Sequence, residues 1–290
     1  MTATRPASGR GADAPARRLG VLGWPVAHSR SPAMHNAALA ELGLHDWRYQ
    51  RLPVPPERFE ETVRALGGAG FHGANVTIPH KQAALALATH ASETAREIGA
   101  ANTLTFTPDS AIRAENTDAP GLLAALGCSP RGMHALVLGA GGSARAAVWA
   151  LRGAGAARVS VWNRTPARAE QLARELGAHA VERPPEAELL VNCTSVGLSA
   201  ESVEPSASGH PALNQLQLTF DQVGRYPHVI DLAYRPGGTA LLAAARAQGV
   251  HAVDGLDVLA AQGALSLELW TGRRAPLELM RRAAGRDGEQ

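Results

Sequence analysis

The sequence contains a single lysine. Of its 28 lysine and arginine residues, only Lys81 is a lysine. Cysteine is almost as scarce, because Cys128 and Cys193 are the two that the chain has. Two distant cysteines are too few for a disulfide framework or a four-ligand zinc site, and their scarcity is typical of a reducing cytosol. We therefore expect a cytoplasmic protein.

Long apolar runs and an excess of one charge are also absent. No stretch reaches the roughly 18 apolar residues of a membrane span, so we expect no membrane contact. The formal net charge is +2 at pH 7 and the arginines are scattered, which argues against a surface that follows nucleic-acid phosphates. Residues 1–18 are rich in Arg, Ala, Gly and Pro without apolar periodicity, and they are predicted to form a disordered tail. Arg17 and Arg18 resemble an export signal only superficially, because polar residues and a proline interrupt the apolar run that follows.

What the chain does contain is an alternation of two patterns. Short apolar runs, such as 19–24 and 73–77, alternate with longer alanine- and leucine-rich segments of helical period, such as 31–42 and 56–66. This alternation is typical of βα units around a mainly parallel sheet. Because a second series of such units starts near Met133, the sequence predicts an α/β protein with two lobes.

The division between the lobes is predicted near residues 116–120. We assign residues 19–117 to the first lobe and 118–255 to the second. The helical segments within 256–290 are assigned to the first lobe, although their pattern alone suits either one. Between 199 and 227 the sequence becomes polar and proline-containing, which predicts a long loop with room for one short helix.

The second lobe begins with a glycine-rich turn. A predicted strand at 135–138 runs directly into GAGGSARAAVWAL, which fits the G-x-G-x-x-A pattern of dinucleotide-binding βαβ units. Its glycines permit a tight turn and a close approach to a pyrophosphate, which the amino terminus of the following helix would face. A plain turn between a strand and a helix is the alternative. The candidate cofactor-binding residues of this turn are Gly139, Ala140, Gly141, Gly142, Ser143 and Ala144.

The end of the next predicted strand, 158–162, indicates which dinucleotide is bound. NAD-binding units usually carry an acidic residue here, where it holds the ribose 2′-hydroxyl. The chain instead reads NRTPAR, so Asn163, Arg164, Thr165 and Arg168 offer two cations and two hydrogen-bonding side chains. These groups suit a 2′-phosphate, and we expect NADP as the cofactor. In the alternative interpretation the arginines only cap a strand and solvate a helix, which leaves their position in the unit unexplained.

Lys81 follows the predicted strand at 73–77, at the edge where open α/β sheets place their ligands. Arginine stays protonated at any physiological pH, whereas the amine of a lysine in a partly desolvated cleft can release and accept a proton near neutrality. An arginine-rich chain that keeps one lysine is therefore expected to need it for proton transfer, although a single surviving lysine is also compatible with chance.

Several short segments strengthen this interpretation by their order and spacing. In the first lobe they are SRSP at 29–32, GANVTIPHK at 73–81, GAANTL at 99–104 and ENTD at 115–118. Later in the chain they are GAGGSA, NRT, NCTSVGL at 192–198, DLAY at 231–234 and DGLDVLAAQ at 254–262. Together they resemble the motifs of shikimate dehydrogenases, from about Leu19 to Trp270.

The resemblance implies a reversible, NADPH-dependent reduction of 3-dehydroshikimate to shikimate, a step towards chorismate and the aromatic amino acids. Lys81 and Asp118 match the family's catalytic pair, with Lys81 as proton donor and acceptor and Asp118 as its hydrogen-bonding partner. The first lobe would then be the substrate-binding and catalytic domain, and the second a Rossmann-type NADP-binding domain.

The resemblance also extends to residues around this pair. Those that match contacts to the substrate carboxylate or ring hydroxyls are Ser29, Ser31, Thr77, Asn102, Tyr234 and Gln262. Three further positions match residues close to the cofactor, namely Glu93, Leu232 and Gly255. Val258 stands where the family often has methionine, which leaves the fit of the nicotinamide open.

Structural interpretations compete with several of these assignments. Asp118, Ser29 and Ser31 precede predicted helices and suit helix capping, while Tyr234 and Gln262 suit a buried phenol and a helix residue facing water. The histidines that flank the proposed cleft have spacings that fit no familiar ligand pattern, so we expect no metal and interpret them as structural or surface residues. They are His28, His35, His72 and His80.

Two other functions stay open. A paralogue acting on quinate, or on an amino analogue of shikimate, would share these motifs, although the NRT segment argues against the NAD-preferring quinate type. A non-catalytic NADP-sensing protein would have no need of both Lys81 and Asp118. The expected partners are a small-molecule substrate and NADP, with neither nucleic acid nor membrane, and the protein is expected to be a monomer or a homodimer.

Overall fold

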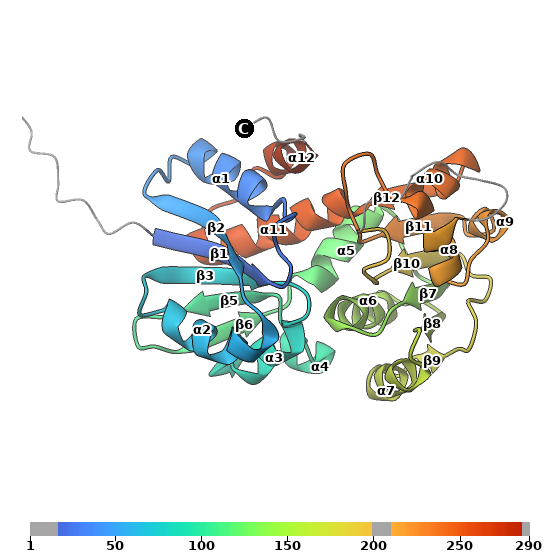
Figure 1. Ribbon diagram of the computed structural model, residues 1–290, viewed down its shortest axis with the longest axis horizontal. Helices are drawn as coiled ribbons and strands as arrows, with labels where there is room; N and C mark the ends of the chain where they lie inside the picture. Colours follow the sequence, from blue (N-terminus) through green and yellow to red (C-terminus); the bar gives the residue numbers. More distant parts are fainter. Residues whose placement is uncertain (1–16, 199–209, 286–290) are drawn as a thin grey trace, which may run out of the picture.

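The computed structural model describes residues 17–198 and 210–285, which form two α/β lobes (Figure 1). Arg17 and Arg18, assigned above to the disordered tail, instead begin the first strand, β1 (Arg17–Gly23). Their guanidinium groups lie over the rings of Trp47 and Phe71, 5.1 and 5.3 Å from the ring centroids. Each arginine thereby gains a cation–π contact that its local sequence does not reveal. The rest of the predicted tail lies outside the described residues.

The sheet of the first lobe has six strands in the order β2-β1-β3-β5-β6-β4. Strand β1 pairs in parallel with β2 (Trp47–Pro53) and β3 (Phe71–Val76). The short hairpin of β5 (Thr103–Phe106) and β6 (Ile112–Glu115) is antiparallel and joins β3 through β5. The two-residue strand β4 (His90–Ala91) pairs in parallel with β6. The last five residues of β1 are all buried, as a central strand that is covered on both faces requires.

Helices and one 3₁₀ turn cover this sheet (Figure 1). Helix α2 illustrates why they form, because Phe59, Val63 and Leu66 recur at helical spacing and are its buried residues. The elements are α1 (Ser31–Glu41), η1 (Pro56–Arg58), α2 (Phe59–Leu66), α3 (Lys81–Ala86) and α4 (Glu93–Ile98).

The second lobe is built on a sheet with the order β12-β11-β10-β7-β8-β9, and all of its pairings are parallel. This is the order of a doubly wound dinucleotide-binding domain. Its strands are β7 (His134–Leu138), β8 (Arg158–Trp162), β9 (His179–Ala180), β10 (Leu189–Asn192), β11 (His228–Asp231) and β12 (His251–Asp254). Its main helices are α6 (Gly142–Gly153), α7 (Pro166–Leu176) and α10 (Ala240–Ala247).

The predicted loop at 199–227 contains two short helices in its described part, where the sequence predicted one. Helix α8 (Pro211–Gln215) starts with proline and is capped by the side chain of His210. Helix α9 (Phe220–Val223) starts with a capping box between Thr219 and Gln222. The T-x-x-Q spacing is a recognisable helix-start signal. Residues 199–209 lie outside the described part of the chain.

Helix α5 (Asp118–Leu126) lies between the lobes (Figure 1). Its Ala119 packs with Ile98 of the first lobe and Ala146 of the second, while Leu122 and Leu126 belong to the core of the second lobe. Helix α5 therefore packs on residues of both lobes.

The carboxyl-terminal helices α11 (Gly255–Thr271) and α12 (Leu277–Gly285) return to the first lobe. Leu267 and Trp270 of α11 and Met280 of α12 pack with Leu19 and Met34 in one core cluster. The indole of Trp270 also donates a hydrogen bond to the carbonyl oxygen of Leu104 at 3.0 Å. This packing completes the first lobe with residues that are remote in sequence.

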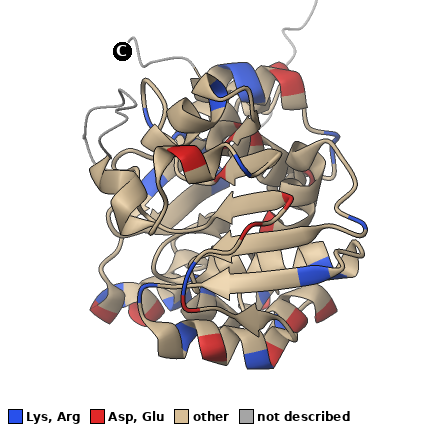
Figure 2. Cartoon of the chain, turned by 90° about the vertical axis from the view of Figure 1, so that its right-hand side faces the viewer, with Lys and Arg blue, Asp and Glu red and all other residues tan. Residues whose placement is uncertain are grey.

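In the cartoon of Figure 2, the basic and acidic residues are interspersed along the chain and lie mainly on helices and loops outside the sheets. Within residues 17–198 and 210–285, no helix combines the length and the apolar character that crossing a bilayer requires.

Candidate active site

A cavity of about 140 Å³ lies between the two lobes, at the carboxyl ends of β3, β10 and β11. Open α/β sheets bind their ligands at this edge. Both lobes contribute to its walls, so the cavity unites segments that are far apart in the sequence. Eleven of the predicted site residues line it: Ser29, Ser31, Thr77, Lys81, Asn102, Asp118, Ser143, Leu232, Tyr234, Gly255 and Gln262.

The remaining predicted residues lie outside the described lining of this cavity. Those of the glycine-rich turn, between β7 and α6, are Gly139, Ala140, Gly141, Gly142 and Ala144. Those after β8 are Asn163, Arg164, Thr165 and Arg168, and Glu93 is the exposed first residue of α4. The structure therefore gathers the substrate and catalytic candidates at one point and places most cofactor candidates on one adjoining edge of the second sheet.

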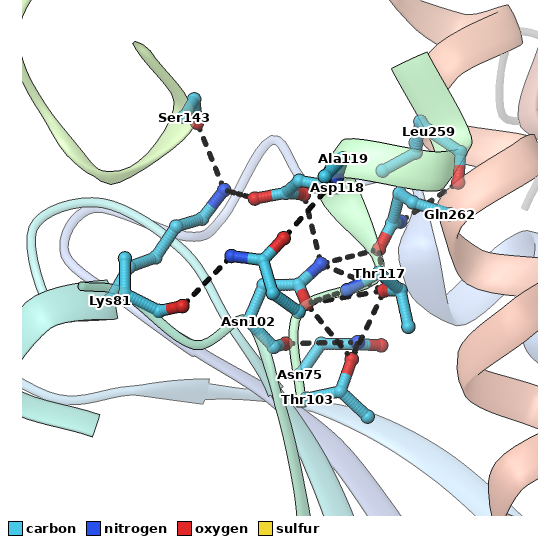
Figure 3. A network of polar contacts seen from close by, with 12 residues as sticks. Asn75, Lys81, Asn102, Thr103, Thr117, Asp118, Ala119, Ser143, Leu259 and Gln262 are labelled. Carbon is cyan, nitrogen blue, oxygen red and sulfur yellow. Dashed lines mark hydrogen bonds and ion pairs between the residues drawn. The ribbon is translucent and has the colours of Figure 1, made fainter. Parts of the chain in front are cut away.

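Lys81 and Asp118 form an ion pair inside the cavity (Figure 3). Lys81 is the first residue of α3 and Asp118 the first residue of α5. The ammonium Nζ lies 2.6 Å from Asp118 Oδ2, and the two side chains are 9% and 17% exposed. The carboxylate caps no helix: the N-cap residue of α5 is Thr117, and the N–H of Ala119 in the first turn donates to Asn116 Oδ1 at 3.2 Å. Both oxygens of Asp118 instead face Lys81 and Asn102.

The glycine-rich turn of the second lobe touches Lys81 directly. A Cβ atom at Gly142 would lie 2.6 Å from Lys81 Cβ, which is too close for two carbon atoms. Lys81 Nζ also donates a hydrogen bond to Ser143 Oγ at 2.9 Å. The turn therefore meets the stem and the ammonium of the lysine at once, so the predicted proton-transfer group lies against the predicted cofactor site.

Asn102 connects Asp118 to the floor of the cavity (Figure 3). Its Nδ2 lies 2.8 Å from Asp118 Oδ1, 2.9 Å from Thr117 Oγ1 and 3.1 Å from Gln262 Oε1. Gln262, interpreted above either as a substrate contact or as a residue facing water, is 7% exposed and belongs to this network. The carboxylate of Asp118 is therefore held at both oxygens, by Lys81 on one side and Asn102 on the other.

The two serines and Tyr234 lie at the other end of the cavity. Ser29 and Ser31 are 5% and 4% exposed. The N-cap residue of α1 is Arg30, whose side chain makes no capping hydrogen bond. Ser29 Oγ accepts a hydrogen bond from the N–H of Ser31, the first residue of α1, at 3.3 Å, so Ser29 also has the helix-capping role considered above. Arg51 donates two hydrogen bonds to the carbonyl oxygen of Ser29, at 3.1 and 2.8 Å. Burial raises the pKa of the Tyr234 phenol, and hydrogen bonds to Arg30 and Ser29 oppose that rise. The phenol therefore stays neutral and can donate a hydrogen bond.

The turn between β7 and α6 has the features that a pyrophosphate requires. Gly139 has φ +109°, and a Cβ there would meet the backbone of Cys193 at 3.2 Å, so glycine alone fits without strain. Helix α6 has Gly141 at its N-cap and no side-chain capping hydrogen bond among the described residues. Its amino-terminal N–H groups are therefore available to an anion.

The segment after β8 supplies cations next to this turn. Arg164 and Arg168 are exposed, and neither forms an ion pair with another residue of the described ranges. Asn163 Nδ2 donates to the carbonyl oxygen of Thr165, which is the N-cap of α7. The segment is therefore a short, locally ordered turn that presents two guanidinium groups at the edge of the sheet.

Loops after β10, β11 and β12 meet behind the cavity through a buried carboxyl group that the sequence did not single out. Asp231 Oδ1 accepts hydrogen bonds from Asn192 Nδ2 and Ala233 N, and Oδ2 accepts one from Thr239 Oγ1 at 2.6 Å. Burial raises the pKa of Asp231 to about 7, although these hydrogen bonds lower it. A Cβ at Gly255 would lie 2.7 Å from the carbonyl oxygen of Leu232, so the loops are also in close contact.

The four histidines that were predicted to flank the cleft do not share one environment. His35 is fully buried and stacks on Tyr49 at a centroid distance of 4.2 Å. His80 is buried and stacks on Phe59, and its Nε2 lies 2.8 Å from the carbonyl oxygen of Val54. His72 Nε2 lies 3.2 Å from the carbonyl oxygen of Trp270, and His28 is exposed. Nowhere in the described ranges do three or more His, Cys, Asp or Glu side chains gather as a metal site would need.

Comparison with known proteins decides which family shares this site. Residues 21–104 match the shikimate dehydrogenase substrate binding domain, 125–213 match shikimate / quinate 5-dehydrogenase, and 255–284 match the shikimate 5'-dehydrogenase C-terminal domain. The chain is 43% identical to the shikimate dehydrogenase (NADP(+)) of Methanopyrus kandleri over 93% of this chain and 96% of the relative. The chain belongs to the shikimate dehydrogenase family.

Further members of the family resemble it closely. A shikimate dehydrogenase (NADP(+)) of Thermus thermophilus is 48% identical over 88% of this chain and 92% of its own. The crystal structure of shikimate 5-dehydrogenase from Thermus thermophilus in complex with NADP(H) and shikimate has a TM-score of 0.79, 44% identity, and covers 92% of this chain and 98% of its own. A 5-ketofructose reductase of Gluconobacter shares the architecture at 31% identity and a TM-score of 0.74, covering 92% of this chain and 97% of its own.

Proposed function

We propose that this member of the shikimate dehydrogenase family is an NADP-dependent enzyme that interconverts 3-dehydroshikimate and shikimate. The observation that carries the proposal is the Lys81–Asp118 ion pair, which lies in the cavity between the lobes and touches the glycine-rich turn. The arrangement brings a proton-transfer group and a dinucleotide site to the same point.

The residues present suit NADP. The turn at Gly139, the uncapped start of α6 and the exposed Arg164 and Arg168 together offer a tight backbone approach, free N–H groups and two cations. Gly139–Ala144 would hold the pyrophosphate, and Asn163, Arg164, Thr165 and Arg168 the 2′-phosphate. When bound, NADPH supplies the hydride for the carbonyl carbon of the substrate. Leu232 and Gly255 border the same cavity and would meet the nicotinamide end. Glu93 is the least supported cofactor contact, because it begins α4 in the first lobe and belongs neither to the cavity lining nor to the edge of the second sheet.

Lys81 is the proposed proton donor and acceptor. As the carbonyl is reduced, negative charge develops on its oxygen, and a proton must reach that oxygen in the same step. The Lys81 ammonium donates hydrogen bonds to Asp118 Oδ2 at 2.6 Å and to Ser143 Oγ at 2.9 Å. Its third N–H can point towards the cavity. Asp118 fixes the lysine's position and hydrogen-bonds the same substrate hydroxyl.

The opposite end of the cavity is proposed to select for a carboxylate. The hydroxyls of Ser29 and Ser31 and the neutral phenol of Tyr234 are hydrogen-bond donors without a charge of their own, and they lie close to Arg51. Thr77, Asn102 and Gln262 would hold the ring hydroxyls from the floor of the cavity. A polar pocket of this kind discriminates strongly, because a substrate without the matching groups leaves buried donors unpaired.

Three alternatives have distinct consequences. A quinate or aminoshikimate paralogue would use the same cavity with a different ring substituent. A ketosugar reductase, suggested by the 5-ketofructose reductase at 31% identity, would act on a substrate without a carboxylate. A non-catalytic NADP sensor would have no use for the buried Lys81–Asp118 pair, which costs desolvation free energy to keep.

The first test measures NADP⁺ reduction by absorbance with shikimate, quinate, fructose or no substrate. The proposal predicts fast turnover of shikimate, weak turnover of quinate and none of fructose. Fast oxidation of a substrate without a carboxylate would contradict it, and NADP binding without turnover of any of them would favour the sensor.

Cofactor choice is tested by Arg164→Gln combined with Arg168→Gln. Loss of both cations should raise KM for NADP⁺ about 100-fold, as two charge-assisted contacts predict, and leave KM for NAD⁺ unchanged. The control for the loss of surface charge is Arg174→Gln, because Arg174 is also exposed and lies with Arg168 on α7.

The scarcity of cysteine supports the predicted cytoplasmic location. That the protein is a monomer or a homodimer stays a prediction.

A further inference from the structure

The side-chain amide of Asn102 can hydrogen-bond Asp118 in only one of its two orientations, the one that points Nδ2 at the carboxylate. Asn102 Oδ1 accepts a hydrogen bond from the backbone N–H of Thr117 at 2.8 Å, and a backbone N–H can only donate. The amide nitrogen must therefore point to the other side, where Asp118 Oδ1 lies 2.8 Å away. If the amide turned over, two oxygens would face each other at this position and Asp118 would lose its second anchor.

A second buried amide beneath Asn102 also has a fixed orientation (Figure 3). Asn75 Nδ2 donates to the main-chain carbonyl oxygen of Asn102 at 3.1 Å, and a carbonyl oxygen can only accept. On the other side, Asn75 Oδ1 accepts a hydrogen bond from the phenol of Tyr49 at 2.8 Å. Asn75 is 5% exposed, so water does not compete for these bonds.

Thr103 connects the two amides. Its Oγ1 lies 3.1 Å from Asn75 Nδ2, which can only donate to it, and 3.1 Å from Asn102 Oδ1, which can only accept from it. Ser266 Oγ is a third acceptor within reach of Asn75 Nδ2, at 2.9 Å, and it lies 3.1 Å from the carbonyl oxygen of Gln262, to which it can only donate. Thr103 is 1% exposed. These contacts allow a chain of hydrogen bonds that runs from Tyr49 through Asn75, Thr103 and Asn102 to Asp118. The hydroxyls of Ser266 and Thr117, 2.9 and 3.2 Å from Thr103 Oγ1, are further partners of the Thr103 hydroxyl.

We propose that Thr103, anchored by Asn75, is a positioning residue for the reaction. Its hydroxyl holds Asn102 Oδ1 and thereby keeps the amide nitrogen on Asp118 Oδ1, which leaves Oδ2 to orient the Lys81 ammonium. The proposal rests on the proposed function, because the orientation of Asp118 matters to the rate only if Lys81 and Asp118 transfer a proton. Asn75, Thr103 and Ser266 lie on β3, β5 and α11. The hydrogen-bond network therefore forms only when α11 has packed on the sheet of the first lobe.

The experiment compares Thr103→Val with Thr103→Ser in the full chain. Valine keeps the shape of threonine and removes its hydroxyl, whereas serine keeps the hydroxyl. Thr105→Val is the matched control, because Thr105 lies two residues along the same strand and has no side-chain hydrogen bond within the described ranges. The quantities are kcat and KM for shikimate at saturating NADP⁺, the Kd for NADPH from its fluorescence, and Tm.

We expect Thr103→Val to lower kcat about tenfold, the scale of a slightly misplaced catalytic group, with an unchanged Kd for NADPH. Thr103→Ser should restore kcat to within about twofold of the wild type, and Thr105→Val should keep the wild-type value. If Thr103 were merely structural, Thr103→Val would have a lower Tm than the wild type but a wild-type kcat. Wild-type kcat in Thr103→Val would overturn the proposal.

A second variant covers the case in which Thr103→Val does not fold. Ser266→Ala removes a hydroxyl 2.9 Å from both Asn75 Nδ2 and Thr103 Oγ1, and it too should lower kcat, by about threefold, through a weakened network. Unchanged kcat in Ser266→Ala would then count against the proposal. A wild-type chain that does not oxidise shikimate would instead refute the proposed function, so the two failures are distinguishable.

Discussion

The buried ring of His35 should lower the unfolding free energy at acid pH, and both the sign and the size of this loss can be predicted. His35 is fully buried against Tyr49, and neither ring nitrogen has a hydrogen-bond partner among the described residues. Burial lowers its pKa from 6.5 to about 3. The native state therefore keeps the ring neutral over a pH range in which the unfolded chain binds a proton. The stabilisation is fully present above pH 6.5 and is lost as the pH falls towards 3.

The magnitude follows from the two pKa values. A difference between 6.5 and about 3 corresponds to about 5 kcal/mol over the whole range, of which about 2 kcal/mol is lost between pH 8 and pH 5. The perturbation is His35→Leu, which removes the titrating ring and keeps an apolar side chain of similar volume. Any constant effect of the substitution on packing cancels when the two pH values are compared.

The assay is urea unfolding of the wild type and the variant at pH 8 and pH 5. The wild type should lose about 2 kcal/mol more unfolding free energy than His35→Leu between these values. His45→Leu, the same substitution at an exposed histidine, controls for loss of a histidine as such. If His35→Leu and the wild type lose the same unfolding free energy, His35 is charged or solvated in the native state and the reasoning is refuted.

Two further predictions concern the second lobe. Burial raises the pKa of Asp231 from 3.8 to about 7, so the stabilisation that its native proton provides is present below pH 3.8 and lost as the pH rises through 7. Between pH 4 and pH 8 the wild type should therefore lose about 4 kcal/mol more unfolding free energy than Asp231→Asn, as measured by urea titrations at the two pH values. Equal losses in the two proteins would contradict this. Gly142→Ala should lower kcat by more than about tenfold because its Cβ would lie 2.6 Å from Lys81 Cβ, whereas Gly153→Ala, in open space at the end of the same helix, should keep wild-type kcat.

The alternation of apolar runs and helical segments was sufficient to predict two α/β lobes. Parallel strands buried on both faces leave unbroken apolar runs, as in β1, and G-x-G-x-x-A marks the first turn of the second lobe. Strand β4 and strand β9 have two residues each, too short for any periodicity to register. Arg17 and Arg18 were misassigned because their cation–π partners, Trp47 and Phe71, are remote in sequence.

The sequence predicted many of the side chains that line the cavity, but not the buried residues that hold them in place. Motifs resembling a known family identified Lys81 and Asp118, and the structure brings them to 2.6 Å. Asn75, Thr103 and Ser266 lie on two strands and a carboxyl-terminal helix, and a single buried Asn, Thr or Ser in each segment has no periodic signal of its own. Only the packing of α11 on the sheet shows that they share hydrogen bonds.

The central claim is that Lys81 moves the proton, and the most direct test compares the wild type with Lys81→Ala and Lys81→Arg in the reduction of NADP⁺ by shikimate. The account predicts that kcat falls by about 10³-fold or more in both variants, as loss of a general acid and base requires, while the Kd for NADPH stays near the wild-type value. Arginine keeps the positive charge beside Asp118 but does not release a proton. Substantial turnover by Lys81→Arg would contradict the account, because a positive charge alone would then be sufficient.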